Sequence, residues 1–540
     1  MTDTSNAPVP GRWATILVFV IASLLIAAWL PDYLRWPWWP DLDAWATIAQ
    51  GWDAGILPYR DVEIFNFPGQ IEISWILGKL VGWGKTWPFY ALDAALLLGL
   101  GALMAVWSRR RFGRVLPGLL GWLAALSTYM NLDYAFVAQR DWQGPLLAVS
   151  CVLVLQTWPG RAGLACSSAL MASAFAIRPH VVLWIPVVVA TMILDGDASR
   201  SSKIRRVGLW GLLFAAIVSV WFGPLIAQGL IGDLIAGVRQ ASYGSGYGKA
   251  TLSSVFQGVL RQASLVDFAL GFTSIEKTYE TLRGWRVLAT LVGLAILSIR
   301  GRWRLAIPWG MTLAVALLYE PLHPKRHAYL ALPLQLVEAV AFGVLAGLIL
   351  DRLAKRSKIA AIVFLVLLVL AVPGVPTYCR PLASFDAMMG REPILVPQTA
   401  APHFFPGERN TPYRWNDYRD TVAYLRAKTN PDTRVMNFLR NVPFPSINGV
   451  VGRVTLWPAE SGVIWLWSVN PKREERFVAA LAKSPEGSVV VWSPGERIFD
   501  PKLKLEGIEN TVRRGFHFEK RFGPMEVWRK NVVEIPKKGD

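Results

Sequence analysis

The sequence is short of cysteine and of charge, and each shortage excludes a class of protein. Its three cysteines cannot build a disulfide framework or a cysteine metal site, because Cys151 and Cys166 lie in apolar segments and Cys379 stands alone. Charged residues make up only 17% of the 540 residues and hydrophobic residues 53%, which is too apolar for a water-soluble enzyme of this length. We therefore expect a membrane protein.

Acidic residues are also scarce, since 38 Asp and Glu stand against 56 Lys and Arg and the formal net charge is +18. So basic a chain could bind nucleic acid. In a membrane protein, however, basic residues also set the topology and meet anionic lipid head groups. We expect membrane lipids among the partners of this protein, and no nucleic acid.

Long apolar runs occupy most of the first 376 residues. About 20 apolar residues cross the ~30 Å hydrocarbon core of a bilayer, and the pattern predicts a membrane α-helical fold with about eleven transmembrane helices. They lie near Trp13–Leu30, Trp87–Trp107, Val115–Met130, Gln143–Trp158, Ala162–Ile177, Val181–Leu194, Val207–Gln228, Trp285–Ile299, Leu305–Tyr319, Ala328–Leu350 and Ile359–Pro376. We expect the first run to be an uncleaved span, because no small-residue cleavage site follows a short apolar segment.

Lys and Arg cluster in alternate connections between these runs. The clusters are Arg109–Arg111 with Arg114, Arg200–Arg206, Arg300–Arg304 and Arg352–Lys358. With eleven spans all four clusters fall on one side, which the positive-inside rule identifies as the cytoplasm. The sequence therefore predicts a multi-pass protein of the bacterial inner (plasma) membrane, with a cytoplasmic N-terminus and an extracytoplasmic C-terminal domain.

The composition changes to a mixed polar pattern after Thr377. Helical periodicity in Tyr418–Lys428 and Lys472–Ala482, and apolar runs at Thr433–Phe438, Gly487–Trp492 and Met525–Trp528, predict a small soluble α/β domain. The predicted organisation is a transmembrane catalytic domain over 1–376, a linker over 377–413 and the extracytoplasmic α/β domain over 414–540.

Two acidic motifs face the extracytoplasmic side in this topology. Asp41 and Asp43 follow the first span, where a carboxylate can take a proton from an incoming hydroxyl or bind a divalent cation. A helix N-cap is the structural alternative for Asp41. Asp141 opens a span, where a carboxylate is costly unless it is paired or faces a water-filled cavity. A helix cap or a salt bridge with Arg140 is its structural alternative.

Cations on the same side could complement these carboxylates. Arg178 ends one span, and Lys325 and Arg326 lie together in a short outer turn. Arg offers a bidentate fork to a phosphate and Lys a point charge. Interfacial anchoring is the alternative role for cations beside a span.

The segments on the predicted outer side contain three short motifs. They are Asp41-Leu-Asp43, the segment Gly55-Ile-Leu-Pro58-Tyr59-Arg60-Asp61 with the later Pro68-Gly69, and Gln139-Arg140-Asp141. Together they resemble the motifs of the C-type, multi-spanning glycosyltransferase superfamily. Within the superfamily the chain is most similar to bacterial relatives of protein O-mannosyltransferases and lipid A aminoarabinose transferases. The resemblance covers roughly the first 350 residues.

The resemblance implies a hexosyl- or pentosyltransferase of cell-envelope glycan biosynthesis. Such an enzyme moves a sugar from a polyprenyl-phosphate donor to a lipid, glycan or protein hydroxyl acceptor on the extracytoplasmic face. It also implies roles for individual side chains. Asp41 or Asp43 would be the general base, Asp141 would order the site or share a divalent metal (Mg²⁺ or Mn²⁺) with Asp43, and the donor phosphate would be held by Arg60, Arg178, Lys325 and Arg326.

Two other functions fit parts of the pattern. A transporter or flippase of lipid-linked glycans would also have many spans, although the paired repeats common in transporters are not evident here. A non-catalytic assembly subunit would work through its soluble domain alone. The segment Arg414–Arg419 only half resembles the Trp-Trp-Asp-Tyr-Gly motif of oligosaccharyltransferases, which disfavours transfer to asparagine.

Overall fold

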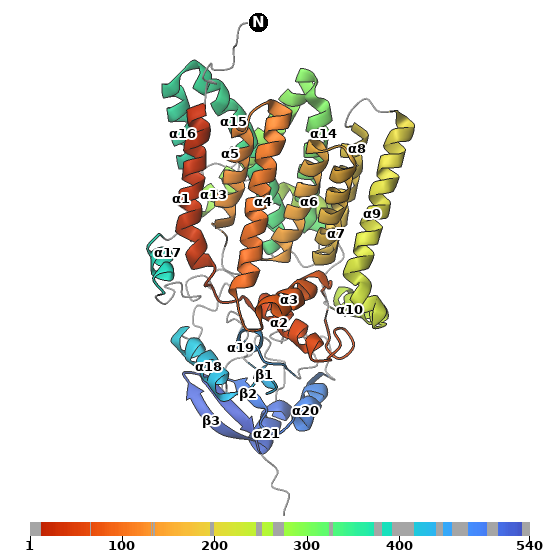
Figure 1. Ribbon diagram of the computed structural model, residues 1–540, viewed down its shortest axis with the longest axis vertical. Helices are drawn as coiled ribbons and strands as arrows, with labels where there is room; N and C mark the ends of the chain where they lie inside the picture. Colours follow the sequence, from red (N-terminus) through yellow and green to blue (C-terminus); the bar gives the residue numbers. More distant parts are fainter. Residues whose placement is uncertain are drawn as a thin grey trace, which may run out of the picture.

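The computed structural model has a bundle of long helices with a small α/β region at one end (Figure 1). It describes residues 12–64, 66–130, 132, 136–194, 199–244, 251–262, 275–322, 328–371, 381–390, 415–438, 447–455, 473–493 and 506–531. The bundle and the α/β region meet through two short helices, which position the candidate site.

A helix lies at each of the eleven segments predicted as spans. These helices are α1 (Arg12–Tyr33), α4 (Trp87–Phe112), α5 (Leu116–Met130), α6 (Arg140–Thr157), α7 (Arg161–Ile177), α8 (Ile185–Leu194), α9 (Arg200–Ala227), α13 (Ile275–Leu297), α14 (Trp303–Leu322), α15 (Leu332–Arg356) and α16 (Lys358–Ala371). Over the described residues, five helical stretches are long and apolar enough to cross a membrane: α1, α4, α9, α15 and Trp285–Leu322. The number of eleven spans stays a prediction.

The stretch Trp285–Leu322 contains two helices. Arg300 and Gly301 have non-helical backbone angles, and Gly301 has a φ of +73°, a left-handed conformation that glycine adopts readily. A Cβ atom on Gly310 of α14 would lie 4.0 Å from Leu294 Cδ1 of α13. The two helices therefore lie side by side as a hairpin, with two arginines in its turn.

Helices α4, α5 and α15 approach one another through glycine. A Cβ on Gly343 of α15 would lie 2.5 Å from the Leu120 carbonyl oxygen of α5. A Cβ on Gly118 of α5 would lie 2.1 Å from the Met104 carbonyl oxygen of α4. Small residues let the backbones of membrane helices pack this closely, and van der Waals contact then drives association.

This packing predicts a large effect of one methyl group. Gly343→Ala is expected to lower the free energy of unfolding by roughly 1–3 kcal/mol, because a methyl group does not fit against the α5 backbone. The measurement is the thermal unfolding midpoint in detergent. The control is Gly99→Ala on α4, where an added Cβ meets nothing within 4 Å and alanine is the better helix former. Equal midpoints for the two variants would contradict the close approach.

Shorter helices connect these elements. Helices α2 (Pro40–Asp53) and α3 (Gly69–Val81) lie between the bundle and the α/β region (Figure 1). The others outside the α/β region are η2 (Pro179–Trp184), α10 (Ile231–Gly244), α11 (Leu252–Gln262), η4 (Ala328–Ala331) and α17 (Pro381–Met388). Helix α17 lies inside the predicted linker and packs on α1, where Ser384 Oγ donates to the Ala28 carbonyl oxygen at 2.6 Å. This contact with α1 stabilises a helix in a segment whose sequence shows no helical periodicity.

The C-terminal region is built on one four-stranded sheet. Its elements are α18 (Trp415–Lys428), β1 (Val435–Phe438), α19 (Asn448–Val451), α20 (Arg473–Lys483), β2 (Val489–Trp492), α21 (Glu506–Gly515), β3 (Phe516–Phe522) and β4 (Met525–Lys530). The strand order is β1-β2-β4-β3, with β1 parallel to β2 and the other pairs antiparallel. Strand β2 is buried along its whole length, as its run of valines predicts.

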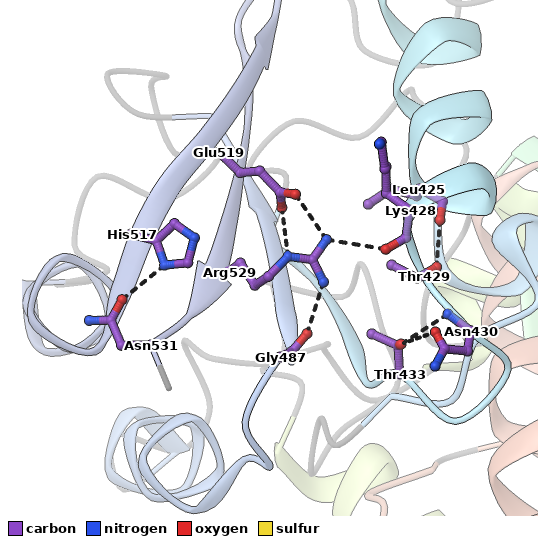
Figure 2. A network of polar contacts seen from close by, with 10 residues as sticks. All are labelled: Leu425, Lys428, Thr429, Asn430, Thr433, Gly487, His517, Glu519, Arg529 and Asn531. Atoms are coloured by element: carbon purple, nitrogen blue, oxygen red, sulfur yellow. Dashed lines mark hydrogen bonds and ion pairs between the residues drawn. The ribbon is translucent and has the colours of Figure 1, made fainter. Parts of the chain in front are cut away.

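Arg529 of β4 ties the sheet to α18 (Figure 2). Its Nε and Nη2 atoms each donate to Glu519 of β3 at 3.0 Å. Nη2 also reaches the Lys428 carbonyl oxygen at the end of α18, and Nη1 reaches that of Gly487, both at 3.3 Å. The guanidinium thus joins β3, β4, α18 and the turn before β2.

Candidate active site

The acidic end of α2 lies where the bundle meets the C-terminal region. Helix α2 begins at Pro40, after Trp39 in the extended cap position, and proline suits the first helical position because its fixed φ is helical. Asp41 is therefore not the cap residue. It lies in the first turn, where the helix dipole favours a carboxylate. Asp41 is partly exposed, which a base that contacts an acceptor requires.

Asp43 has a different environment, since its side chain is completely buried. The backbone N–H of Val450, in α19, donates to Asp43 Oδ1 at 2.8 Å, and Thr47 Oγ1 donates to Oδ2 at 3.4 Å. A Cβ on Gly449 would lie 2.9 Å from Asp43 Oδ1, so only glycine allows this approach. Asp43 thus binds the C-terminal region to α2.

A further hydrogen bond strengthens this docking. Gln50 Nε2 of α2 donates to the Gly452 carbonyl oxygen at 2.8 Å. Tyr418 of α18 is buried close to Asp43, and burial raises the pKa of its hydroxyl well above the usual value, with a further increase from the Asp43 charge. The C-terminal region therefore holds the helix that carries Asp41.

Asp141 belongs to a buried cluster of three side chains from three helical elements. Arg178, at the end of α7, places Nε 2.8 Å from Asp141 Oδ1. The Tyr319 hydroxyl of α14 donates to the same oxygen at 3.3 Å and accepts from Arg178 Nε at 3.2 Å. Asp141 is fully buried and Arg178 is 6% exposed. A buried carboxylate paired in this way matches the expectation for an ionisable residue at the start of a span.

Arg140 connects the Asp141 cluster to α2. Its Nε lies 3.7 Å from Asp141 Oδ2, and its guanidinium lies 5.6 Å from the ring centre of Trp45, within the range of a cation–π contact. Trp45 follows Asp41 by four residues and therefore lies on the same face of α2. The arginine bridge places the two acidic motifs at the same end of the bundle.

The structure describes two of the four predicted phosphate ligands, and these two have different partners. Arg178 lies in the Asp141 cluster. Arg60 has other partners: it is paired with Asp233 of α10 at 3.1 Å, and its Nη2 donates to the Gly229 carbonyl oxygen at 3.1 Å. Arg60 therefore fastens the segment after α2 to α10. Lys325 and Arg326 lie outside the described residues.

The described side chains do not form a ready metal site. No three His, Cys, Asp or Glu residues come together among the described residues. Asp43 accepts the Val450 N–H, and Asp141 is paired with Arg178. The two carboxylates predicted to share a divalent cation thus have partners in different elements.

Asp93 is an intramembrane acid that the sequence analysis did not single out. Its carboxylate accepts hydrogen bonds from the hydroxyls of Tyr33, at 2.9 Å, and of Tyr129, and from Gln143 Nε2 at 2.8 Å. Gln70 of α3 donates to Gln143 Oε1 at 2.6 Å. This network joins α1, α3, α4, α5 and α6 beneath the acidic motifs. The sequence feature that could have revealed this network is an aspartate inside a predicted span, because such a residue is by default functional or paired.

Glu72 of α3 is another buried acid that was not among the predicted site residues. It is 6% exposed, and its Oε1 accepts no hydrogen bond from the described residues. It lines a cavity of about 500 Å³ together with Trp52, Trp75 and Trp221. Burial raises its pKa to about 8, so the side chain is mostly protonated at neutral pH.

Stability is expected to fall with rising pH because of Glu72. The folded state holds the Glu72 proton more tightly than the unfolded state, so the folded protein loses stability as pH rises from about 5 to about 8. The loss is up to roughly 4 kcal/mol. Glu72→Gln should reduce the decrease of the unfolding midpoint between pH 5 and pH 8. Asp420→Asn, which changes an exposed carboxylate, is the control, and parallel pH profiles for the wild type and Glu72→Gln would contradict the assignment.

The bundle, the two interfacial helices and the C-terminal sheet together form a fold that is similar, over nearly the whole chain, to that of the solved membrane protein ArnT. The structure confirms at the level of the fold the resemblance indicated by the motifs. The chain is similar to the crystal structure of ArnT from Cupriavidus metallidurans bound to undecaprenyl phosphate, with a TM-score of 0.56 and 14% identity over 97% of this chain and 99% of that chain. For apo ArnT the TM-score is 0.55, with 14% identity over 96% and 98% of the two chains. Neither a family model nor a curated protein matches the sequence.

Proposed function

We propose that the protein is a membrane glycosyltransferase that takes a sugar from a polyprenyl-phosphate donor. The observation that carries this proposal is the similarity of nearly the whole chain to an enzyme fold that was crystallised with undecaprenyl phosphate. The acceptor is a lipid, glycan or protein hydroxyl. The reaction takes place on the extracytoplasmic face of the inner membrane, where the positive-inside rule places the C-terminal region.

In this mechanism Asp41 is the general base. Its carboxylate takes the proton of the acceptor hydroxyl, whose oxygen attacks the anomeric carbon as the bond to the donor phosphate breaks. The polyprenyl phosphate leaves with the bonding electrons, and direct displacement inverts the anomeric centre. The charge on the leaving phosphate is offset by arginines at this end of the bundle, first of all Arg178 and Arg140.

Asp43 and Asp141 support this chemistry indirectly, by positioning other residues. Asp43 fixes α2 to the C-terminal region and so orients Asp41. Asp141 holds Arg178 in place through the short ion pair. Both are positioning residues in this proposal, and Lys325 and Arg326 remain candidates for the donor phosphate.

The experiment uses purified protein in nanodiscs with a synthetic polyprenyl-phosphate sugar and an envelope lipid extract as acceptor. Release of free polyprenyl phosphate together with a glycosylated product supports transfer. Movement of intact donor across the bilayer without cleavage would instead indicate a flippase. A matched reaction with the nucleotide sugar alone should give no product, because the donor must carry the lipid.

Chelation tests the divalent metal directly. We expect EDTA to leave the rate within about twofold of the untreated enzyme, because arginines supply the positive charge. Added Mg²⁺ or Mn²⁺ should then have no effect. A loss of activity that either ion restores would establish the metal-assisted alternative with Asp43 and Asp141 as ligands.

A further inference from the structure

A cavity of about 440 Å³ is lined by the end of α4, the turn between α13 and α14, and the second half of α15. These parts of the bundle lie away from the α/β region (Figure 1). The walls of the cavity come from α4, α13, α14 and α15. Its apolar lining includes Trp107, Leu294, Trp309 and Val344. Along α13 it extends from Thr290 to Leu297, which is about 10 Å of helix.

The rim of this cavity is strongly basic. Five cations and one carboxylate, Asp351, line it. The cations are Arg114 after α4, Arg300 and Arg302 in the turn between α13 and α14, and Arg352 and Lys355 near the end of α15. Asp351 is already paired with Arg114 at 2.5 Å and with Lys355 at 3.1 Å. The single negative charge is therefore compensated within the rim.

The other three arginines keep their charge for a ligand. Arg300, Arg302 and Arg352 are exposed. Arg300 and Arg352 form no ion pair or hydrogen bond with the described residues, and Arg302 lies 5.8 Å from the ring centre of Phe112. Arg302 also lines a neighbouring cavity of about 390 Å³ with Arg111 and Arg304. Cations that served only as interfacial anchors would not need to converge on a cavity.

We propose that this cavity binds an anionic phospholipid. The guanidinium groups of Arg300, Arg302 and Arg352 hold the phosphate, and the acyl chains lie on the apolar floor between α13, α14 and α15. Basic pockets between membrane helices on the cytoplasmic side bind anionic head groups in this way. The proposal is independent of sugar transfer, and only the choice of the cytoplasmic leaflet depends on the predicted orientation.

The test is a lipid titration of the delipidated full-length protein, followed by native mass spectrometry. Phosphatidylglycerol is expected to give a bound lipid that zwitterionic phosphatidylcholine does not give. The variant Arg300→Ala/Arg302→Ala should bind phosphatidylglycerol about tenfold more weakly. The matched control Arg109→Ala/Arg205→Ala removes two exposed cations that do not line the cavity, and it should bind like the wild type.

Two further arms separate a lipid from a free anion. Leu348→Trp narrows the apolar part of the cavity without changing charge, and it should also weaken phosphatidylglycerol binding. Inorganic phosphate at millimolar concentration should neither raise the unfolding midpoint as the lipid does nor displace the lipid. Equal binding of phosphatidylcholine, equal loss in the control variant, or full replacement by inorganic phosphate would each overturn the proposal.

Discussion

Asp41→Asn is expected to lower the rate of sugar transfer by about 10²–10⁴-fold and to leave the unfolding midpoint unchanged. An amide cannot accept the proton of the acceptor hydroxyl, and general-base catalysis contributes a factor of this size. The side chain is partly exposed in the first turn of α2, and asparagine has nearly the same size and keeps one acceptor oxygen. The measurement is release of polyprenyl phosphate in nanodiscs, together with thermal unfolding of the same preparation.

Asp43→Asn is the matched control for this prediction. Its carboxylate is buried and accepts hydrogen bonds at both oxygens, from the Val450 N–H and from the Thr47 hydroxyl. An amide can accept at only one of these positions, so the change should lower the free energy of unfolding by about 1–3 kcal/mol. Transfer should stay within about tenfold of the wild type. The opposite pattern, with full activity in Asp41→Asn and a severe loss in a stable Asp43→Asn, would make Asp43 the base.

The elements of the bundle were predictable because each depends on a local property. Apolar runs such as Trp87–Trp107 need only their own length and composition to form a helix, and α4 occupies that segment. The basic clusters could also be found from local sequence alone. Arg114, Arg300 and Arg352, from three of these clusters, line one cavity of the bundle. Helix α21 and strand β3 were not predicted, although Ile508 and Val512 of α21 are one turn apart and buried.

The roles of the site residues could not be predicted in the same way. Asp41 and Asp43 look equivalent in the sequence, and only a contact with a residue 407 positions away separates them. Arg60 similarly has a distant partner, Asp233, which is 173 positions away in the sequence. Charge type and position in a motif select candidate residues, whereas tertiary contacts decide which of them are buried, paired or accessible.

Arg178→Ala is expected to lower the free energy of unfolding by about 3–5 kcal/mol, because it leaves the Asp141 carboxylate buried without its closest partner. Arg140 Nε remains at 3.7 Å, too far to replace the lost hydrogen bond. Thermal and denaturant unfolding in detergent measure this effect. Tyr319→Phe removes only one hydroxyl from the same cluster, so it should cost about 1 kcal/mol.

The double variant Asp141→Asn/Arg178→Met separates stability from catalysis. It replaces the buried ion pair by neutral groups of similar size, which restores most of the stability in comparable cases. If Arg178 also stabilises the leaving phosphate, the double variant should be stable but should still transfer sugar about 10²–10³-fold more slowly than the wild type. A double variant that recovered both stability and rate would show that the pair only supports the fold, and the phosphate would then have to be held by other cations, with Arg140 the nearest.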